Sequence, residues 1–232
     1  MTPDELAALH PVLYHVGPPE ARGLIETHGL LSPLALCGLL GFDDARTEAV
    51  LTTLRRSTTP LGAGVALNDN SPISLKRLAD CLEPGLTPEA WLRELNSRVF
   101  LFPTRQGADN FVAARANAAR ARDVWSFDTA RFASAFLDRL EITPFNTGAT
   151  LRTTPRRGLL TFAPLEGLYY AEWRSRRREA GHKKGLDSIK EVCIRHSAPG
   201  AAGFALGVER IPPASTSPVC RSPASRPATT PG

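Results

Sequence analysis

The sequence predicts an α+β domain over residues 1–210 and a disordered tail over residues 211–232. Helix and strand signals interleave along the first 210 residues, but without the regular strand–helix rhythm of a doubly wound sheet. The 232 residues are 42% hydrophobic and 22% charged, which is typical of a globular domain and excludes a fibrous or membrane-spanning body. Pro, Ser, Thr and Ala supply 16 of the last 22 residues, too little apolar surface to offset the entropy of ordering.

Capping residues, prolines and glycines mark the helices of the first half of the chain. Thr2, Pro3 and Glu5 have the spacing of a capping box, in which side chains satisfy two free amides at a helix start. Gly29 stands where a helix ends in a left-handed residue. We expect helices after Thr2, from Pro18 to Gly29, after Ser32, from Asp43 to about Arg56, over Leu75–Leu82 and over Thr87–Asn96.

The strongest strand candidates are Val12–Val16 and Arg98–Phe102, which are apolar, β-branched or aromatic and end at turn-forming residues. The remaining elements follow from the same signals. We expect a short strand within the loop Pro60–Asn70, a long helix from Gln106 to Arg122, a strand over Val124–Phe127, a helix from Asp128 to Asp138, short β segments after Leu140, a strand over Ile189–Arg195 and an edge strand near Phe204–Val208.

Charge and cysteine usage limit the classes of function. The net charge is +5, and because residues 211–232 hold two arginines and no acid, residues 1–210 carry only +3, which is no nucleic-acid signature by itself. The four cysteines form no CxxC pair, so we expect no metal site. The first residues lack a signal peptide pattern, and the longest apolar stretch has 14 residues, so we expect no membrane segment and a cytoplasmic location.

Phosphate-loop, HExxH, GxSxG and dinucleotide-binding motifs are absent from the sequence. The first residue with possible chemistry is His15, in the middle of the first predicted strand. A single histidine on a strand is more often a hydrogen-bonded core residue than a ligand, and both interpretations stay open.

The residues around His15 carry a resemblance to a known family. Leu13-Tyr14-His15, followed by Ile25 and Gly29-Leu30-Leu31-Ser32, resembles the opening of ADP-ribosyltransferase-fold proteins, which include DarT toxins and NAD-using RNA 2′-phosphotransferases. The body over residues 12–210 is similar to an uncharacterised bacterial family of unknown function that is expected to share this fold, a split β-sheet with surrounding helices. The other stretches that carry this similarity are Asn96–Phe100, Asn146–Thr150, Arg157-Gly158 and Thr161-Phe162.

This resemblance implies an NAD-dependent transferase acting on a nucleic acid or protein, with roles for individual residues. A first strand holds the NAD ribose, and a strand-to-helix junction lines the nicotinamide. The implied cofactor-binding residues are Tyr14, His15, Phe102, Thr104 and Arg105. The implied catalytic acid is Glu191, on a late strand. The threonine that such proteins have two residues after the histidine is Gly17 here.

The residue types suit that chemistry. Cleavage of the nicotinamide–ribose bond develops positive charge on the sugar, which a nearby carboxylate stabilises. Arg105, at a helix start, could bind a pyrophosphate with two parallel hydrogen bonds, although an exposed helix end needs no such role. Glu191 has the alternative of a strand-edge acid paired with Lys190 or Arg195.

Two further groups of residues have both a functional and an ordinary interpretation. Asn146–Thr150 with Arg156 and Arg157 could hold a phosphate with backbone amides, or form a glycine turn with exposed arginines. A basic run follows Tyr169, Tyr170 and Trp173, and it suits single-stranded nucleic acid or a solvated loop. Its members are Arg174, Arg176, Arg177, Arg178, Lys183 and Lys184.

Three classes of function therefore remain open at the level of sequence. The first is the NAD-dependent transferase that the resemblance implies. The second is a non-catalytic module that binds a nucleic acid or partner through the same fold. The third is an immunity or regulatory protein with neither activity.

Overall fold

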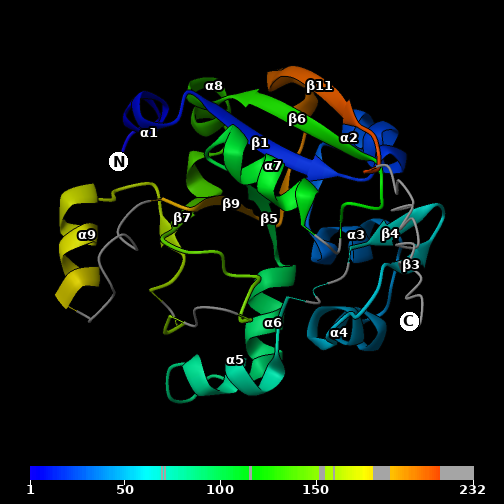
Figure 1. Cartoon of the computed structure of the whole chain (residues 1–232), viewed down its shortest axis with the longest axis horizontal. Coiled ribbons are helices and arrows are strands. Elements are labelled where there is room, and N and C mark those ends of the chain that lie inside the picture. Colours follow the sequence, from blue (N-terminus) through cyan, green and yellow to red (C-terminus); the bar gives the residue numbers. More distant parts are fainter. Residues whose placement is uncertain are drawn as a thin grey trace, which may run out of the picture.

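The protein is an α+β structure built around two antiparallel sheets that meet at one point, as the computed structural model in Figure 1 shows. The structure describes residues 1–68, 70, 72–114, 117–151, 155–158, 160–179 and 189–214. The predicted α+β class is confirmed. Most of the tail predicted over residues 211–232 lies outside the described residues.

The first sheet has the order β1-β6-β11, with β1 over Val12–Gly17, β6 over Arg122–Asp128 and β11 over Ala205–Ile211. All its neighbours are antiparallel, and β1 pairs with β6 from Val12↔Asp128 to Gly17↔Asp123. Side chains alternate between the two faces of such a strand. Val16 faces α7 (Arg105–Ala113), whereas Leu13 faces the main core.

The second sheet has the order β5-β9-β7-β8, and β9 occupies a central position in it. Its strands are β5 (Arg98–Leu101), β9 (Glu191–Arg195), β7 (Leu140–Thr143) and β8 (Ala163–Pro164). The two sheets are joined where Tyr14 of β1 pairs with Phe102, the residue that follows β5. Figure 1 shows the first sheet at the top and β5, β9 and β7 beneath it.

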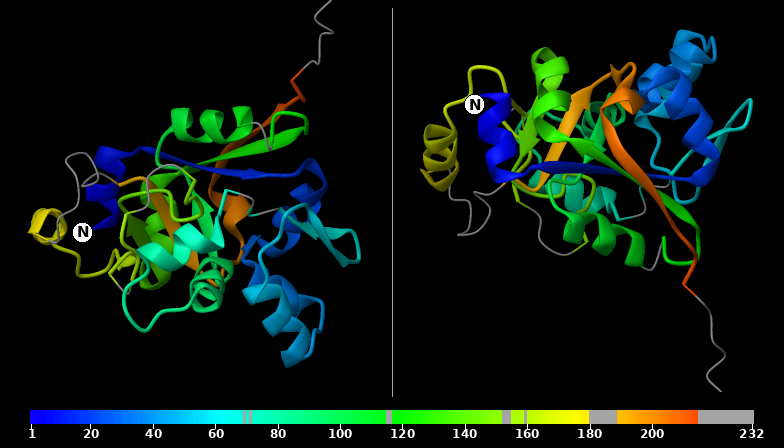
Figure 2. Two further views of the ribbon diagram at one scale, coloured as in Figure 1. Left: turned by 60° about the horizontal axis from the view of Figure 1, so that its bottom comes forward. Right: turned by 90° about the horizontal axis from the view of Figure 1, so that it is seen from above.

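Helices cover both sheets. Their bounds are α1 Pro3–Leu9, α2 Arg22–His28, α3 Pro33–Leu39, α4 Asp44–Thr52, α5 Leu75–Cys81, α6 Pro88–Asn96, α8 Thr129–Ala135 and α9 Tyr170–Glu179. Short 3-10 segments cover Pro19–Ala21, Leu137–Arg139 and Ala201–Phe204. Short strand pairs are β2 (Leu30–Leu31) with β10 (Ser197–Ala198), and β3 (Thr59–Gly62) with β4 (Val65–Leu67). In both views of Figure 2, α9 lies at one end of the molecule and α4 toward the other.

The largest hydrophobic core lies between the two sheets. Leu13 of β1 and Phe127 of β6 meet Leu101 of β5 and Val192 of β9 there, all essentially inaccessible to solvent. A second cluster packs Trp91 of α6 and its neighbours against the opposite face of the β5-β9 ladder. The second sheet is therefore covered on both faces, and a polar side chain on it is removed from water.

Most predicted elements are confirmed within a few residues, and the helix from Gln106 to Arg122 is the main error. Helix α7 ends at Ala113, and Arg122 already begins β6. The cause is tertiary: Arg122 is buried, and its guanidinium donates to the side-chain oxygens of Asn117 at 2.8 Å and Asn68 at 2.9 Å. The contact with Asn68 joins residues 54 apart in the sequence, and such tertiary contacts outweigh local helix preference.

Candidate functional site at the junction of the sheets

Three strands that carry sequence-predicted site residues lie next to one another in space. Tyr14 N donates to the carbonyl oxygen of Phe102 at 2.9 Å, and Phe102 N donates to that of Tyr14 at 2.7 Å. One residue earlier, Leu101 pairs with Val192, the neighbour of Glu191 on β9. The order β1, β5, β9 therefore brings the histidine strand, the strand-to-helix junction and the acid strand together.

His15 lies at the point where the two sheets separate. Its ring nitrogen Nδ1 is 3.0 Å from the carbonyl oxygen of Phe100 on β5. Burial lowers the pKa of His15, and the contact with the Phe100 carbonyl acts in the opposite direction. The ring is thus a hydrogen-bonded, partly buried histidine. Its second nitrogen, Nε2, lies toward Gly17, 3.7 Å from the place that a Cβ on that residue would take.

Glu191 is buried in the second sheet, with 7% of its surface exposed. Its Oε2 accepts a hydrogen bond from Thr147 N at 3.1 Å, and lies 2.8 Å from Thr147 Oγ1 and 3.2 Å from Thr143 Oγ1. Burial raises the pKa of Glu191 to about 7, against the opposing effects of the hydrogen bonds from Thr147 and Thr143 and of the positive charge of Arg157. The alternative of a strand-edge acid paired with Lys190 or Arg195 is wrong, because β9 is a central strand and Arg195 instead pairs with Glu141.

Arg157 organises the loop that supplies Thr147. Its side chain is fully buried and donates to the carbonyl oxygens of Ala149 at 2.6 Å and Pro155 at 2.8 Å. The predicted group Asn146–Thr150 with Arg157 is therefore brought together. The Arg157 guanidinium, however, binds carbonyl oxygens of its own loop, and the loop amide of Thr147 binds a carboxyl group.

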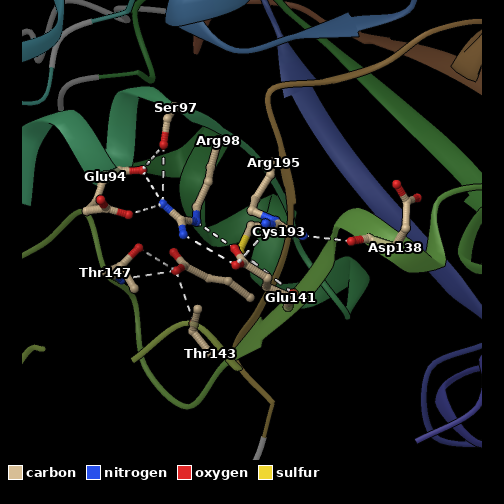
Figure 3. A network of polar contacts seen from close by, with 10 residues as sticks. Glu94, Ser97, Arg98, Asp138, Glu141, Thr143, Thr147, Cys193 and Arg195 are labelled. Atoms are coloured by element: carbon tan, nitrogen blue, oxygen red, sulfur yellow. Dashed lines mark hydrogen bonds and ion pairs between the residues drawn. The ribbon is translucent and has the colours of Figure 1, made fainter. Parts of the chain in front are cut away.

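A buried ion pair between Arg98 of β5 and Glu141 of β7 lies on the same sheet as Glu191. Sequence reasoning missed this pair, which Figure 3 shows. Arg98 Nε donates to Glu141 Oε2 at 2.6 Å, and both side chains are less than one-tenth exposed. Arg98 also reaches Glu94 Oε2 at 2.6 Å, and the thiol of Cys193 lies 3.9 Å from Glu141 Oε2. The four-residue spacing of Glu94 and Arg98 was the one readable signal in the sequence, whereas Glu141 is 43 residues from Arg98.

The other predicted cofactor-binding residues lie on the α7 side of the first sheet. Tyr14 and Arg105 line a hollow of about 260 Å³, together with Val124, Ser126 and residues 207–209 of β11. Thr104 caps α7 by accepting from Gly107 N at 3.1 Å. Because His15 and Tyr14 are consecutive on a strand, their side chains point to opposite faces. The structure therefore divides the predicted set between two faces of β1.

Arg105 is already paired within the protein. Its Nε donates to Asp109 at 2.8 Å and its Nη1 to Glu209 at 2.7 Å. The side chain is 42% exposed, which agrees with the interpretation of a solvated helix end. To bind a pyrophosphate, Arg105 must exchange these carboxylates for the ligand.

The basic run lies on α9, at one end of the molecule. Arg176 pairs with Glu172, and Arg176 and Arg178 are exposed. Trp173 is buried in the main core and stacks on Tyr170 with ring centres 5.6 Å apart, so its ring packs inside the protein. Tyr169 is 77% exposed. Lys183, Lys184 and the side chain of Arg177 lie outside the described part of the chain.

The described residues offer neither a metal-binding cluster nor a membrane-spanning helix. Across those ranges, no group of three or more His, Cys, Asp or Glu side chains is placed to hold a metal ion. Nor does any helix in them combine the length and apolar character required to cross a bilayer.

Comparison with known proteins gives one match. The model of the family of unknown function DUF7002 matches residues 11–205, which include the junction, Glu191 and α9. Searches of curated proteins and of solved structures found no match.

Proposed function

We propose that this chain, which belongs to the family of unknown function DUF7002, binds NAD at the junction of its two sheets and transfers ADP-ribose to a nucleic acid or protein. The proposal takes its fold analogy from the resemblance of the segment from Leu13 to Ser32 to the opening of ADP-ribosyltransferase-fold proteins. An NAD-linked phosphate transfer uses the same binding site and is the second reaction within this class.

One observation carries the proposal. The strands that hold His15 and Glu191 flank the same strand, β5, and they approach it at adjacent positions, Phe102 and Leu101. These segments are far apart in the sequence: Phe100 of β5 follows His15 of β1 by 85 residues. Their adjacency matches the ordered set of histidine strand, strand-to-helix junction and late acid that the resemblance implies.

The side chains proposed to contact NAD fit it in part. An imidazole on β1 suits the hydroxyl groups of a ribose, and a buried carboxyl on β9 suits positive charge that develops on a sugar carbon. The nicotinamide ribosyl group supplies that cationic chemistry when NAD is bound. Arg105 fits less well, because Asp109 and Glu209 already occupy its guanidinium.

Under this proposal Glu191 stabilises charge and His15 positions the sugar. A carboxyl group whose pKa is about 7 exchanges its proton in the physiological range, which is a property of catalytic acids. The ionised form is the one that stabilises a cation, so transfer should accelerate as the pH rises through 7.

A binding experiment tests the first step. Isothermal titration of NAD into the wild-type protein should give saturable binding, which His15→Ala weakens by about tenfold or more, as the loss of one hydrogen bond to a charged or polar ligand implies. His28→Ala is the matched control, because His28 is an exposed histidine at the end of α2. Absence of binding to folded wild-type protein at millimolar NAD would contradict the proposal.

A second candidate function is a nucleic-acid-binding module without catalysis, favoured by the exposed arginines of α9 and the 77% exposed ring of Tyr169. Binding through these residues should weaken steeply with salt, because each neutralised phosphate releases counterions. Fluorescence anisotropy with a single-stranded oligonucleotide, for wild type and Arg178→Ala, measures that slope. A slope unchanged by the substitution would exclude this surface.

A further inference from the structure

A fully buried carboxylate holds two arginines at the end of the first sheet that lies beside α2 (Figure 1). Asp123 Oδ2 accepts a hydrogen bond from Arg22 Nε at 2.8 Å, and Oδ1 accepts one from Arg210 Nε. Burial raises the pKa of Asp123, but the hydrogen bonds from Arg210 and Arg22 outweigh it and hold this pKa below its ordinary value. Asp123 is therefore ionised at neutral pH, and the three groups together carry one positive charge.

Both guanidinium groups keep donors that Asp123 does not use. Arg22 is 37% exposed and Arg210 is 50% exposed. Among the described residues, neither Nη atom of Arg22 has a hydrogen-bond partner, and Nη1 of Arg210 has none. One arginine is enough to neutralise one buried carboxylate, so the second leaves a surplus of positive charge with several N–H donors near the surface. A planar set of such donors matches the oxygens of a phosphate group.

The two arginines lie one row away from His15 on the same face of the sheet. Gly17 of β1 and Arg210 of β11 pair with Asp123 from opposite sides. Alternate residues of β1 share a face, so the His15 side chain stands about 7 Å along the strand from this row. A Cβ on Gly17 would lie 3.7 Å from His15 Nε2. The glycine therefore puts no side chain between the imidazole and the arginines.

The tautomer of His15 indicates which group accompanies the phosphate. A carbonyl oxygen only accepts, so Nδ1, which lies 3.0 Å from the Phe100 carbonyl oxygen, carries the proton of the neutral ring. Nε2 is then an acceptor, and it has no hydrogen-bond partner in the part of the chain that the structure describes. A sugar hydroxyl donates to such a nitrogen.

We propose that Arg22 and Arg210 bind a phosphate group of a ligand whose ribose hydroxyl donates to His15 Nε2. The ligand chemistry is thus that of a nucleotide, either NAD or the 5′-phosphorylated end of a nucleic acid. Where the ligand is NAD, the arginines hold its pyrophosphate, and that part of the inference rests on the proposed function. Phosphate recognition itself does not depend on whether NAD is cleaved.

Glu20 opposes this binding. It lies in the turn between β1 and α2, its side chain is exposed, and its negative charge acts on Arg210. A negative charge near the arginines repels a phosphate, so Glu20→Gln should tighten the binding of an anionic ligand. An ion pair with a structural role alone gives no such gain.

Isothermal titration of inorganic pyrophosphate into the full chain at low ionic strength tests the site. We expect saturable binding by the wild type, weaker by about tenfold or more in Arg22→Gln and in Arg210→Gln, because each loses charged hydrogen bonds. Binding should be tighter in Glu20→Gln. Arg93→Gln, the matched control, removes one charge from an exposed arginine of α6 that is paired with Glu48, and should leave the affinity unchanged.

No saturable binding to folded wild-type protein, or an equal loss in Arg93→Gln, would overturn the inference and leave Asp123 with a structural role. If a glutamine variant does not fold, Arg22→Lys and Arg210→Lys keep the charge beside Asp123 but remove the planar set of donors. Both lysine variants should still bind pyrophosphate more weakly than the wild type, and full affinity in both would contradict the proposal.

Competition identifies the source of the phosphate. Displacement of pyrophosphate by NAD but not by nicotinamide riboside assigns the site to the dinucleotide. Displacement by a 5′-phosphorylated oligonucleotide, but not by the unphosphorylated strand, assigns it to a nucleic-acid end. His15→Ala should weaken the nucleotide more than pyrophosphate, and equal weakening would overturn the ribose contact. Pyrophosphate binding without NAD binding would overturn the transferase and leave this site intact, whereas NAD binding that survives loss of both arginines would do the reverse.

Discussion

The imidazole of His15, and not a backbone group of a neighbouring strand, contacts the carbonyl oxygen of Phe100. Alternate residues of a strand direct their backbone groups to the same edge, so Phe100 and Phe102 both face β1. Phe102 pairs with the backbone of Tyr14, but the Phe100 carbonyl is 3.0 Å from the His15 ring instead. The sheet therefore divides at His15, with the buried carbonyl still satisfied.

Replacement of His15 should cost stability as well as ligand binding. His15→Ala leaves the Phe100 carbonyl without its partner, which we expect to lower the free energy of unfolding by about 1–3 kcal/mol. Urea denaturation followed by circular dichroism measures the difference. His28→Ala, at an exposed position, should change stability by less than about 0.5 kcal/mol; equal losses in the two variants would refute the role given to His15.

Stability should fall as the pH rises from about 4.5 to about 7, because Glu191 has a raised pKa in the folded protein. Over that interval the folded state keeps a proton that the unfolded state has lost, so the unfolded state binds fewer protons and the slope of stability with pH is negative. Glu191→Gln removes this contribution, which is on the order of 3 kcal/mol at its largest. The difference in free energy of unfolding between wild type and Glu191→Gln should therefore decline toward pH 7 and then stay constant; parallel profiles at all pH values would contradict the shift.

The buried pair Arg98–Glu141 should respond to single and double substitutions in opposite ways. Arg98→Met removes the partner of the Glu141 carboxylate in the core and leaves Arg195 Nε 3.7 Å away. We expect the free energy of unfolding to fall by roughly 3–5 kcal/mol. The double variant Arg98→Met/Glu141→Leu should recover most of that loss. Chemical denaturation of both proteins gives the comparison.

An exposed pair provides the control for this prediction. Arg93 and Glu48 form an ion pair in which both side chains are 47% exposed. Arg93→Met should cost less than about 1 kcal/mol. A loss at Arg93 as large as the loss at Arg98 would mean that burial does not govern the strength of these pairs.

Substitution of Gly29 should lower stability more than substitution of Gly41. Both have positive φ, +79° and +67°, but an added Cβ at Gly29 would lie 2.0 Å from the Ala198 carbonyl oxygen, whereas at Gly41 it meets no atom within 4 Å. We expect Gly29→Ala to lower stability by roughly 3 kcal/mol or more and Gly41→Ala by about 1–2 kcal/mol. Thermal unfolding of the two variants distinguishes crowding from backbone strain, and similar melting temperatures would contradict the close approach of Gly29 to β10.

Local signals in the sequence were enough to predict the elements but not their long-range partners. The capping box at Thr2 and the strand around His15 depend on neighbouring residues, and both are confirmed. The sequence offers Lys190 and Arg195 as alternative partners of Glu191, yet its contacts are with Thr143 and Thr147, 48 and 44 residues away. Strand pairing creates such contacts, and neither periodicity nor spacing encodes which strands become neighbours.

The central claim is that Glu191 supports cleavage of NAD at the junction of the sheets. The most direct measurement is nicotinamide release from NAD by purified wild type and Glu191→Gln, with and without added DNA or RNA. The account predicts release by the wild type that is lost in Glu191→Gln while NAD affinity is largely kept, since the carboxylate acts mainly in the transition state. Release by neither protein under any condition, from protein shown to be folded, would contradict the transferase and favour the binding module.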